Sequence, residues 1–413
     1  VVLMKRTEII YIPPNPTLHY YCHLSKNLYN QATYLIKQSL KENKLLSYYD
    51  LNNMLKDSEN YKELPTQSAQ QILKIVSRNW KSYFKALKEY TNNPNKFKAK
   101  PKPPSFKPKD GLFMLVFTNQ QCKIKDGKLK SDKTKGFITQ TVVRFPKKIN
   151  LIIPTRLPDN TNIREVRLIP TLEGYKIEII YEKKPIITEL NDNKIISIDL
   201  GMKNIITMTN NFGDKPIIIR DNGKGIKSTN QYFNKIVSKL KSIYNKQNIK
   251  IGRKLKKVII KRNFKVNDWI HKASRFIVDY CVKNKVSKII IGYNDDWKQE
   301  VSLGKKNNQT FTLIPFKMLI DKIVYKAEEY GIKVILTEES YTSKCSFFDD
   351  EEIGKKKEYA GKRFCRGLFK TLKGWVVNAD VNGAYNIMRK VVDNAFKGID
   401  LCKLPTHPVK VYI

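Results

Sequence analysis

The chain has 413 residues, and 78 Lys and Arg against 38 Asp and Glu give it a formal net charge of +40. This excess is far beyond what solubility requires and favours nucleic acid as a polyanionic partner, although a lysine-biased composition accounts for part of it. Hydrophobic residues make up 41% of the sequence. The chain can therefore bury a core, which excludes a disordered basic tail.

Cysteine use and hydropathy predict an intracellular protein. The six cysteines are scattered singly, which is typical of reduced thiols. No apolar run approaches the roughly 18 residues of a membrane span, and the first residues lead into a strand without a signal-peptide pattern. We therefore expect no membrane partner. The expected location is the cytoplasm or nucleoid of a prokaryote, or the host nucleus for a eukaryotic or viral protein.

Patterning in the N-terminal part predicts a strand over Met4–Ile12 and helices over 18–46 and 65–90. The segment Asn95–Lys109 differs, since it holds six Lys, four Pro and two Phe and no acid. Such a segment is either a solvated linker or an extended arm along a phosphate backbone. The second interpretation makes four side chains candidates for nucleic-acid contacts: Lys96, Lys98, Lys100 and Lys102.

Short β-type runs separated by polar turns follow, and they predict a small barrel between 113 and 182, with a linker over 184–193. Beyond the linker, strands come first and helices and strands then alternate, which is an α/β arrangement. The strands are expected at 194–199, 204–209, 216–220, 288–292 and 333–336, the helices at 226–258, 266–284, 315–330 and from 382, and the basic segment 341–374 as irregular.

Acidic residues stand where several of these elements end or begin. Asp199 closes an apolar strand, and Asp380 opens or caps the last helix. Glu338 and Glu339 follow another strand and point to opposite faces, so only one of them can meet Asp199. Metal-dependent phosphodiester cleavage needs carboxylates from separate elements around ions about 4 Å apart. Each acid alone also has an ordinary explanation as a turn or cap residue.

Motifs in a fixed order join these acids. They are Ile198-Asp-Leu-Gly201, Ile290-Ile-Gly292, Ile314-Pro-Phe316, Glu339-Ser-Tyr-Thr-Ser343, Gly361-Lys-Arg363 with Arg366-Gly-Leu-Phe369, and Asn378-Ala-Asp-Val-Asn-Gly-Ala384. Together they resemble the TnpB (OrfB) family of transposon-encoded proteins, which is related to the Fanzors and to type V CRISPR effectors. The resemblance covers about 195–390; the N-terminal half is similar only in plan.

The resemblance implies a multidomain α+β protein in which a helical recognition lobe and a small β-barrel precede an RNase H-like (RuvC) α/β nuclease domain. Its partners would be a guide RNA from the transposon end and double-stranded target DNA, which it would cut beside a short motif. The expected order is a first barrel (wedge) strand in 1–16, the recognition lobe with its Lys/Pro-rich arm in 17–110, the wedge barrel in 111–183, a linker in 184–193, the nuclease domain in 194–340, a basic insertion in 341–374, a final nuclease segment in 375–393 and a tail in 394–413.

The resemblance also implies the catalytic residues. Asp199 and Asp380 match the first and third acids, but Gly292 stands where many relatives have the second. Asp295, Asp296 and Glu300 follow too late in the sequence to match cleanly. A Fanzor-related branch takes its glutamate from the segment before Tyr-Thr-Ser, so we favour Glu339 over Glu338.

These three acids, Asp199, Glu339 and Asp380, would hold Mg²⁺, with two ions expected and Mn²⁺ as a substitute. The ions would assist the attack of water on phosphorus and leave a 3′-hydroxyl. Relatives often carry two Cys-x-x-Cys pairs before the third acid, whereas this interval has only Cys345 and Cys365. Two thiolates cannot complete a tetrahedral site, so we predict no structural zinc.

Basic surfaces complete the prediction. Residues 222–267 contain fourteen Lys and Arg and no acid, and a helix face of one sign beside a nuclease site suits a guide–target duplex. The candidates there are Arg253, Lys254, Lys256, Lys257, Lys261 and Arg262. In the basic insertion, Lys362, Arg363, Arg366 and Lys370 could line the path of the cut strand.

Two other functions fit the same sequence. One is a nuclease-dead, RNA-guided DNA-binding repressor, against which the presence of all three acids argues. The other is a transposase-type protein that joins DNA strands directly, since the acids suit transfer as well as hydrolysis.

Overall fold

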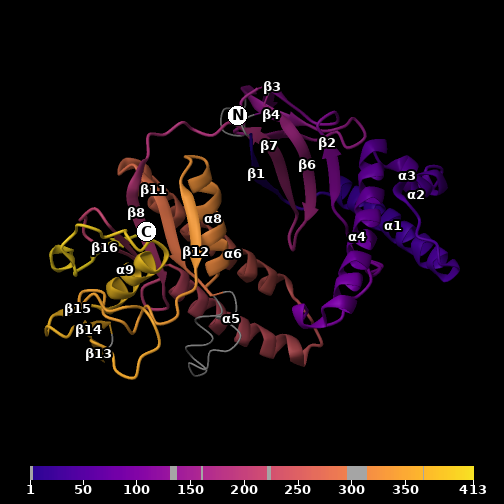
Figure 1. Cartoon of the computed structure of the whole chain (residues 1–413). Coiled ribbons are helices and arrows are strands. Elements are labelled where there is room, and N and C mark those ends of the chain that lie inside the picture. Colours follow the sequence, from indigo (N-terminus) through magenta and orange to yellow (C-terminus); the bar gives the residue numbers. More distant parts are fainter. Residues whose placement is uncertain (1–2, 131–136, 160, 221–224, 295–313, 366) are drawn as a thin grey trace. The chain divides into compact units, whose positions relative to one another are not determined.

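The computed structural model describes residues 3–130, 137–159, 161–220, 225–294, 314–365 and 367–413 (Figure 1). It divides the chain into an N-terminal unit, Val1–Lys184, and a C-terminal unit, Pro185–Ile413. This boundary lies at the start of the linker expected from the sequence. Among the described helices, none combines the length and hydropathy that a bilayer span requires.

Helices form the first part of the N-terminal unit. They are α1 (Pro16–Ser39), α2 (Tyr48–Leu55), α3 (Glu59–Glu63) and α4 (Thr66–Asn92), with single 3-10 turns at Leu40–Glu42 and Pro94–Lys96. Asn15 begins α1 by accepting a hydrogen bond from the Leu18 N–H, and Ser47 and Asp50 cap each other's backbone at the start of α2. The periodicity predicted α1 and α4, but it treated α2 and α3 as turn and cap residues because both helices are short.

The strands of this unit form two antiparallel sheets, where we expected a small barrel. The first sheet has the order β1-β7-β6-β2 and the second β3-β4-β5. The chain turns between Thr118 and Cys122, so the strand that follows leaves the first sheet and pairs in the second. Their bounds are β1 (Met4–Ile12), β2 (Leu115–Thr118), β3 (Lys123–Lys130), β4 (Phe137–Arg144), β5 (Ile152–Pro154), β6 (Ile163–Pro170) and β7 (Tyr175–Lys183).

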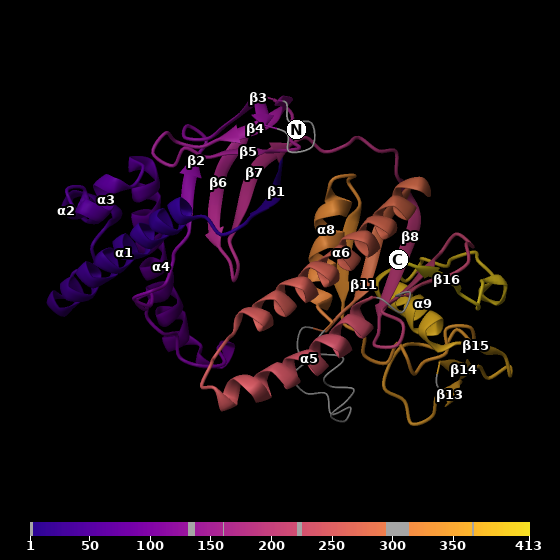
Figure 2. The ribbon, with the colours of Figure 1, turned by 180° about the vertical axis from the view of Figure 1, so that it is seen from behind.

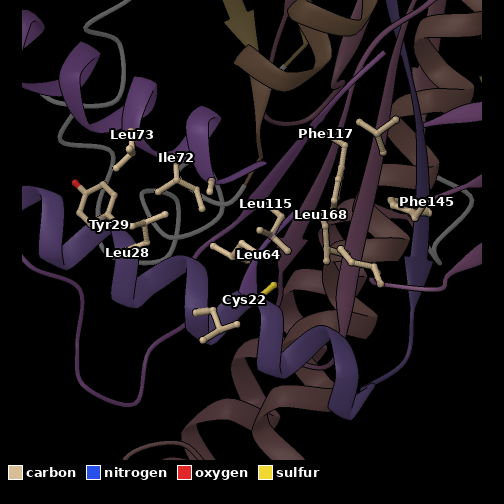
Figure 3. Packing of buried hydrophobic residues seen from close by; sticks show 14 of the residues in the cluster. Cys22, Leu28, Tyr29, Leu64, Ile72, Leu73, Leu115, Phe117, Phe145 and Leu168 are labelled. Atoms are coloured by element: carbon tan, nitrogen blue, oxygen red, sulfur yellow. The ribbon is translucent and has the colours of Figure 1, made fainter. Parts of the chain in front are cut away.

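One hydrophobic cluster unites the helices and both sheets of the N-terminal unit. Figure 3 shows Leu28, Ile72 and Leu73 from the helices beside Leu115, Phe117 and Leu168 from the strands. The Lys/Pro-rich arm lies along α1, because Lys26 and Asn30 donate hydrogen bonds to the carbonyls of Lys109 and Lys107. The arm is therefore held to α1 at its C-terminal end.

A six-stranded mixed sheet organises the C-terminal unit, with the order β12-β11-β8-β9-β10-β16. The first three strands in the chain pair antiparallel, and β11 and β12 add in parallel beside β8. The bounds are β8 (Asn191–Leu200), β9 (Ile206–Asn210), β10 (Ile217–Arg220), β11 (Val286–Gly292), β12 (Lys333–Thr337) and β16 (Val409–Tyr412).

Helices cover both faces of this sheet, as the two opposite views show (Figure 1, Figure 2). On one face, α6 (Arg253–Lys283) and α8 (Phe316–Glu328) pack on Ile196, Ile198 and Ile289. On the other face, α9 (Ala379–Val391) packs on Ile195 and Ile290. Successive isoleucines point to opposite faces of a strand, so a sheet covered on both sides requires the apolar runs that made these strands recognisable.

Three predictions about this unit were wrong in detail. The long basic helix is interrupted between α5 (Ile226–Lys246) and α6, rather than at 259–265, because Asn248 takes a left-handed conformation and Gly252 lets the chain pass close to Tyr244. The basic insertion is not wholly irregular, since its β13 (Lys362–Cys365) and β14 (Leu368–Lys370) form a small sheet with β15 (Val376–Asn378). The C-terminal tail supplies β16, which pairs with β10.

We predict that both faces of the sheet contribute equally to stability. Ile289→Ala and Ile290→Ala should each lower the free energy of unfolding of the C-terminal unit by about 2–5 kcal/mol, since each removes a fully buried side chain. Ile187→Ala is the matched control, because this isoleucine is fully exposed. Pulse proteolysis in urea, with fragments of this unit followed by mass spectrometry, measures the shift. A loss for only one of the two buried positions would contradict the two-sided packing.

Candidate active site

Asp199 reaches the candidate site from the end of β8, the strand at the centre of the sheet. The chain then turns tightly, since Gly201 donates its N–H to the Ile205 carbonyl and has no room for a side chain: a Cβ there would lie 2.8 Å from the Asn204 oxygen. This turn sends the chain back into β9. The Asp-Leu-Gly motif thus combines a carboxylate at a strand end with the glycine that the next turn requires.

Asp380 lies in the first turn of α9, and Asn378 rather than Asp380 caps the helix. The Asn378 side chain accepts hydrogen bonds from the N–H groups of Asp380 and Val381, so the Asp380 carboxylate is not used as a cap. Small residues bring α9 close to the sheet, as the sequence predicted. Ser197 donates to the Ala384 carbonyl at 2.6 Å, and a Cβ on Gly383 would lie 3.1 Å from Oδ2 of Asp199.

Glu339 follows β12 and fills the space left by Gly292 on the neighbouring strand. In the parallel ladder, Gly292 stands beside Thr337. A Cβ at position 292 would collide with Oε1 of Glu339 and lie 2.6 Å from Cδ1 of Ile387. Asn294 accepts the Glu339 N–H at 3.2 Å. The glycine that replaces the expected second acid is therefore the residue that gives Glu339 its place.

Glu338 points elsewhere. Its carboxylate forms an exposed ion pair with Lys390 of α9 at 2.8 Å and also accepts the Ser340 N–H. In contrast, Oε1 of Glu339 is buried and has no hydrogen-bond partner among the described residues. The two neighbouring acids thus have opposite environments, in the way that their position at a strand end predicts.

The motif after Glu339 forms a strained turn that α9 holds in place. Tyr341 has a φ of 67°, in the left-handed region that non-glycine residues rarely adopt. The Thr342 hydroxyl donates to the Glu339 carbonyl at 2.8 Å. From α9, Asn382 donates to the Cys345 carbonyl, and Asn386 donates to the carbonyls of Thr342 and Cys345. The helix that presents Asp380 therefore also fixes the segment that presents Glu339.

Burial and mutual repulsion dominate the electrostatics of the acids. Burial raises the pKa of Asp199 to about 7, the charge of Asp380 adds to the rise, and Arg363 opposes it. Burial likewise raises the pKa of Glu339 to about 8, with further contributions from Asp199 and Glu338 against a small effect of Lys390. Shifts of this kind cluster at functional sites. They show that Asp199 interacts with both of the other acids.

These residues suit a divalent cation, although the acids are not arranged as a finished ligand set. Among the described residues, no three His, Cys, Asp or Glu side chains stand close enough together to hold a metal ion. Asp380 instead accepts from Arg363 at 3.3 Å and from Asn204 at 2.7 Å. The donors are all carboxylate oxygens, which Mg²⁺ prefers, and the buried, unpartnered Oε1 of Glu339 needs a cation or a proton.

The basic candidates fall into three groups. The arm lysines (Lys96, Lys98, Lys100 and Lys102) are exposed in the N-terminal unit, where Lys96 pairs with Glu89. Most of the α6 candidates (Arg253, Lys254, Lys256, Lys257 and Lys261) are exposed or half-exposed at the start of that helix. Arg262 braces α5, since it donates to Asn230 at 2.8 Å and lies over the Phe233 ring.

In the small β13–β15 sheet, Lys362, Arg363 and Lys370 are exposed, and only Arg363 contacts a candidate acid. Arg366 lies outside the described residues, as do Asp295, Asp296 and Glu300. Of the basic residues that were named from the sequence and that the structure describes, Arg363 is thus the one joined to the acids.

Sequence reasoning missed the asparagines around the acids. Asn204, Asn382 and Asn386 are buried and make specific hydrogen bonds. Their only sequence signal is their position a few residues after an acid, since Asn204 follows Asp199 and Asn382 and Asn386 follow Asp380. Asparagine is just as common in ordinary turns and helix caps. Their role therefore becomes visible only when the elements are assembled.

Parts of the chain match families and proteins that are already known. Residues 178–298 match the OrfB_IS605 family, described as probable transposase, and residues 316–387 match the Cas12f1-like TNB domain. A TnpB-like protein, ORF457 of Acidianus two-tailed virus, is 26% identical over 94% of this chain and 87% of its own length. The chain is therefore similar to the TnpB/OrfB proteins of the IS605 type, while these matches do not support the Fanzor-related branch.

Two further similarities concern Cas12f1. The CRISPR-associated endodeoxyribonuclease Cas12f1 of Sulfoacidibacillus thermotolerans is 34% identical over 125 residues, which are 30% of this chain and 26% of that protein. A solved Cas12f1-sgRNA-target DNA complex superimposes with a TM-score of 0.49 at 14% identity, over 93% of this chain and 98% of that one.

The raised pKa values predict a pH dependence of stability in the metal-free protein. Because Asp199 and Glu339 bind protons more tightly when folded, the free energy of unfolding should fall as pH rises from about 4, their ordinary pKa, through about 7 and 8. Thermal unfolding in EDTA at several pH values measures this fall. In the double variant Asp199→Asn/Glu339→Gln, the free energy of unfolding should depend much less on pH. An equal pH dependence in both proteins would contradict the shifts.

Proposed function

We propose that the chain is an RNA-guided DNA endonuclease of a mobile element, which hydrolyses double-stranded DNA beside a short recognition motif. The observation that supports this most is the convergence of Asp199, Glu339 and Asp380 from β8, β12 and α9 at one end of a mixed sheet. The strand order 3-2-1-4-5 of β10-β9-β8-β11-β12 supports assigning the sheet to the RNase H-like class. The similarity to TnpB and Cas12f1 proteins supports the guide RNA and the DNA substrate.

The three acids would hold Mg²⁺, with Mn²⁺ as a substitute. When bound, the ions would activate water, neutralise charge at the phosphate and stabilise the leaving oxygen. The protein's own part is to keep the carboxylates together in spite of their repulsion. The hydrogen bonds from α9 to the turn after Glu339, and from Ser197 to α9, do this.

Arg363 is suited to help with the substrate rather than the metal. Its guanidinium is half-exposed and pairs with Asp380, on the small sheet beside the acids. A guanidinium there can bind phosphate oxygens in two-pronged fashion. We assign the exposed lysines of the arm and of α6 to contacts with guide and target phosphates, which position nucleic acid without reading its sequence. The domain order expected from the sequence is part of this proposal.

The bound RNA and the first acid provide the test. The full chain is expressed with its native flanking DNA and purified in high salt, and the RNA that remains bound is sequenced. We expect one dominant RNA that ends near the 3′ boundary of the gene. With that RNA, the protein should cut a matching target in Mg²⁺. Asp199→Ala should abolish cutting and retain the RNA, whereas Asp192→Ala, at an exposed position of the same strand, should retain both the cutting and the RNA.

Other outcomes of this test select other functions. RNA and target binding without cutting in any divalent ion would establish the repressor. Joined or protein-linked DNA without a guide would establish the strand-transfer protein. A mixed host RNA population that is lost as salt rises would mean that the charge of +40 serves general polyanion binding.

The neighbouring glutamates provide a matched pair. Glu339→Gln should lower the cutting rate more than about 100-fold. Mutation of a residue that only hydrogen-bonds to a metal ligand already lowers metal affinity or activity roughly 10–100-fold, and Glu339 is proposed as a ligand itself. Glu338→Gln should stay within about threefold of the wild type, since it breaks only an exposed ion pair. Single-turnover cleavage at saturating guide measures both rates. The reverse order of the two effects would show that Glu338 is the second acid.

A further inference from the structure

A buried asparagine connects the third acid to a basic hollow that the proposed mechanism does not use. Asn204 is 5% exposed, and both ends of its side-chain amide are engaged. Its Nδ2 donates to Oδ2 of Asp380 at 2.7 Å. Its Oδ1 accepts from Nε and Nη2 of Arg220 at 3.1 and 3.0 Å. Arg220, Asn204 and Asp380 thus form a continuous hydrogen-bonded chain.

The turn after β8 makes this chain rigid. Gly201 packs against the Asn204 carbonyl, so the segment that presents Asp199 also sets the position of Asn204. Because the amide orients Asp380, one short segment fixes two of the three acids relative to each other. Asn204 donates to Oδ2 of Asp380, while Oδ1 of Asp380 faces Arg363.

Arg220 has binding capacity beyond Asn204. A guanidinium has five N–H donors, and Nη1 of Arg220 donates to no residue that the structure describes. Arg220, Lys203, Lys227 and Ile205 line a hollow of about 170 Å³. Lys227 donates to the Lys203 carbonyl at 2.6 Å, which ties the two lysine-bearing segments together. Among the residues that the structure describes, three cations and one apolar side chain therefore line the hollow.

We propose that this hollow is a binding site for one backbone phosphate of the DNA strand being cut, and that Asn204 is a positioning residue that couples its occupancy to Asp380. Three cations suit a phosphate, and a guanidinium held by its Nε edge presents its other nitrogen in a fixed direction. The hydrogen-bonded chain to Asp380 places the hollow next to the scissile phosphate. The inference rests on the proposed nuclease function and adds a second phosphate subsite to it.

The first experiment removes one phosphate charge at a time. Target strands that carry a single neutral methylphosphonate at successive positions are cut by wild type, Arg220→Gln and the control Lys410→Gln, an exposed cation on the adjacent strand β16. For wild type and control, the methylphosphonate should lower the cutting rate about tenfold at one position near the cut, as expected for the loss of a charged hydrogen bond. Arg220→Gln should be about tenfold slower throughout, with no further loss at that position. If the losses from Arg220→Gln and from the methylphosphonate multiply at every position, Arg220 does not bind that phosphate and the proposed subsite is wrong.

The role of Asn204 needs its own readout. Asn204→Ala should reduce the single-turnover rate and leave the target Kd within about twofold, since it disturbs Asp380 and not the phosphate contacts. Asn204→Gln, with the same amide on a longer stem, should recover only part of the rate. A larger change in Kd than in rate would overturn the positioning role.

The second experiment needs no cleavage, so it separates failure of the subsite from failure of the proposed function. In EDTA, amine acetylation of Lys203 is followed by mass spectrometry with a single-stranded phosphodiester oligonucleotide and with its uncharged methylphosphonate analogue. Lys203 should be protected several-fold by the charged strand only, more than Lys410, and Arg220→Gln should remove this difference. Equal protection of Lys203 and Lys410, or equal protection by both strands, would overturn the inference even if the protein cuts DNA.

Discussion

The repulsion between partly buried carboxylates is the constraint on which the C-terminal unit depends. Asp199 interacts unfavourably with both Glu339 and Asp380, and partial burial removes much of the water that would screen their charges. A fold that brings such groups together must hold them by other interactions. Here those interactions are apolar packing on both faces of the sheet and the buried hydrogen bonds of α9. The metal-free site is therefore a locally unstable region within a stable frame, which is the usual relation between function and stability.

Helix α9 has three tasks that explain its composition. Its small residues allow close approach to β8, its asparagines hold the turn after Glu339, and its first turn presents Asp380. Its apolar side packs on Ile195 and Ile290. A helix with so many requirements leaves few positions free, so the final motif is the longest uninterrupted one in the sequence.

The sequence revealed those parts of the fold that depend on long-range periodicity or on a strand buried on both faces. The strands from β8 to β12 and the helices α1, α4, α8 and α9 were recognisable for this reason. The pairing of strands could not be recognised in the sequence, because strand partners far apart in sequence leave no local signal. Thus β3 pairs in the second sheet after a turn, and β16 from the tail joins the sheet of the C-terminal unit. The interruption before α6 depends on Asn248 and Gly252, whose effect differs from that of any other polar loop only once Tyr244 is in place.

The candidate site divides in the same way. Asp199, Glu339 and Asp380 were found from strand ends and from the resemblance. The alternation of side chains along a strand indicated that only one of Glu338 and Glu339 can meet Asp199, and the choice of Glu339 followed from the resemblance. The contact of Arg363 with Asp380 and the hydrogen bonds of Asn204 could not be derived, since each joins segments more than 15 residues apart. Basic residues in a chain of charge +40 carry little positional information, because there are too many of them to distinguish by sequence.

The pairing of Gly292 with Glu339 has a consequence for how sequences of this kind are compared. Two adjacent parallel strands end at the same edge of the sheet, so a carboxylate can reach one point in space from either strand, provided that the other strand leaves room. A column-by-column alignment would record a missing acid after β11 and classify such a chain as an inactive paralogue. In this chain, the glutamate after β12 occupies the space that the glycine at the end of β11 leaves open. Surveys that look for inactivated copies of mobile elements would therefore need to consider the alignment columns of Gly292 and Glu339 as a pair.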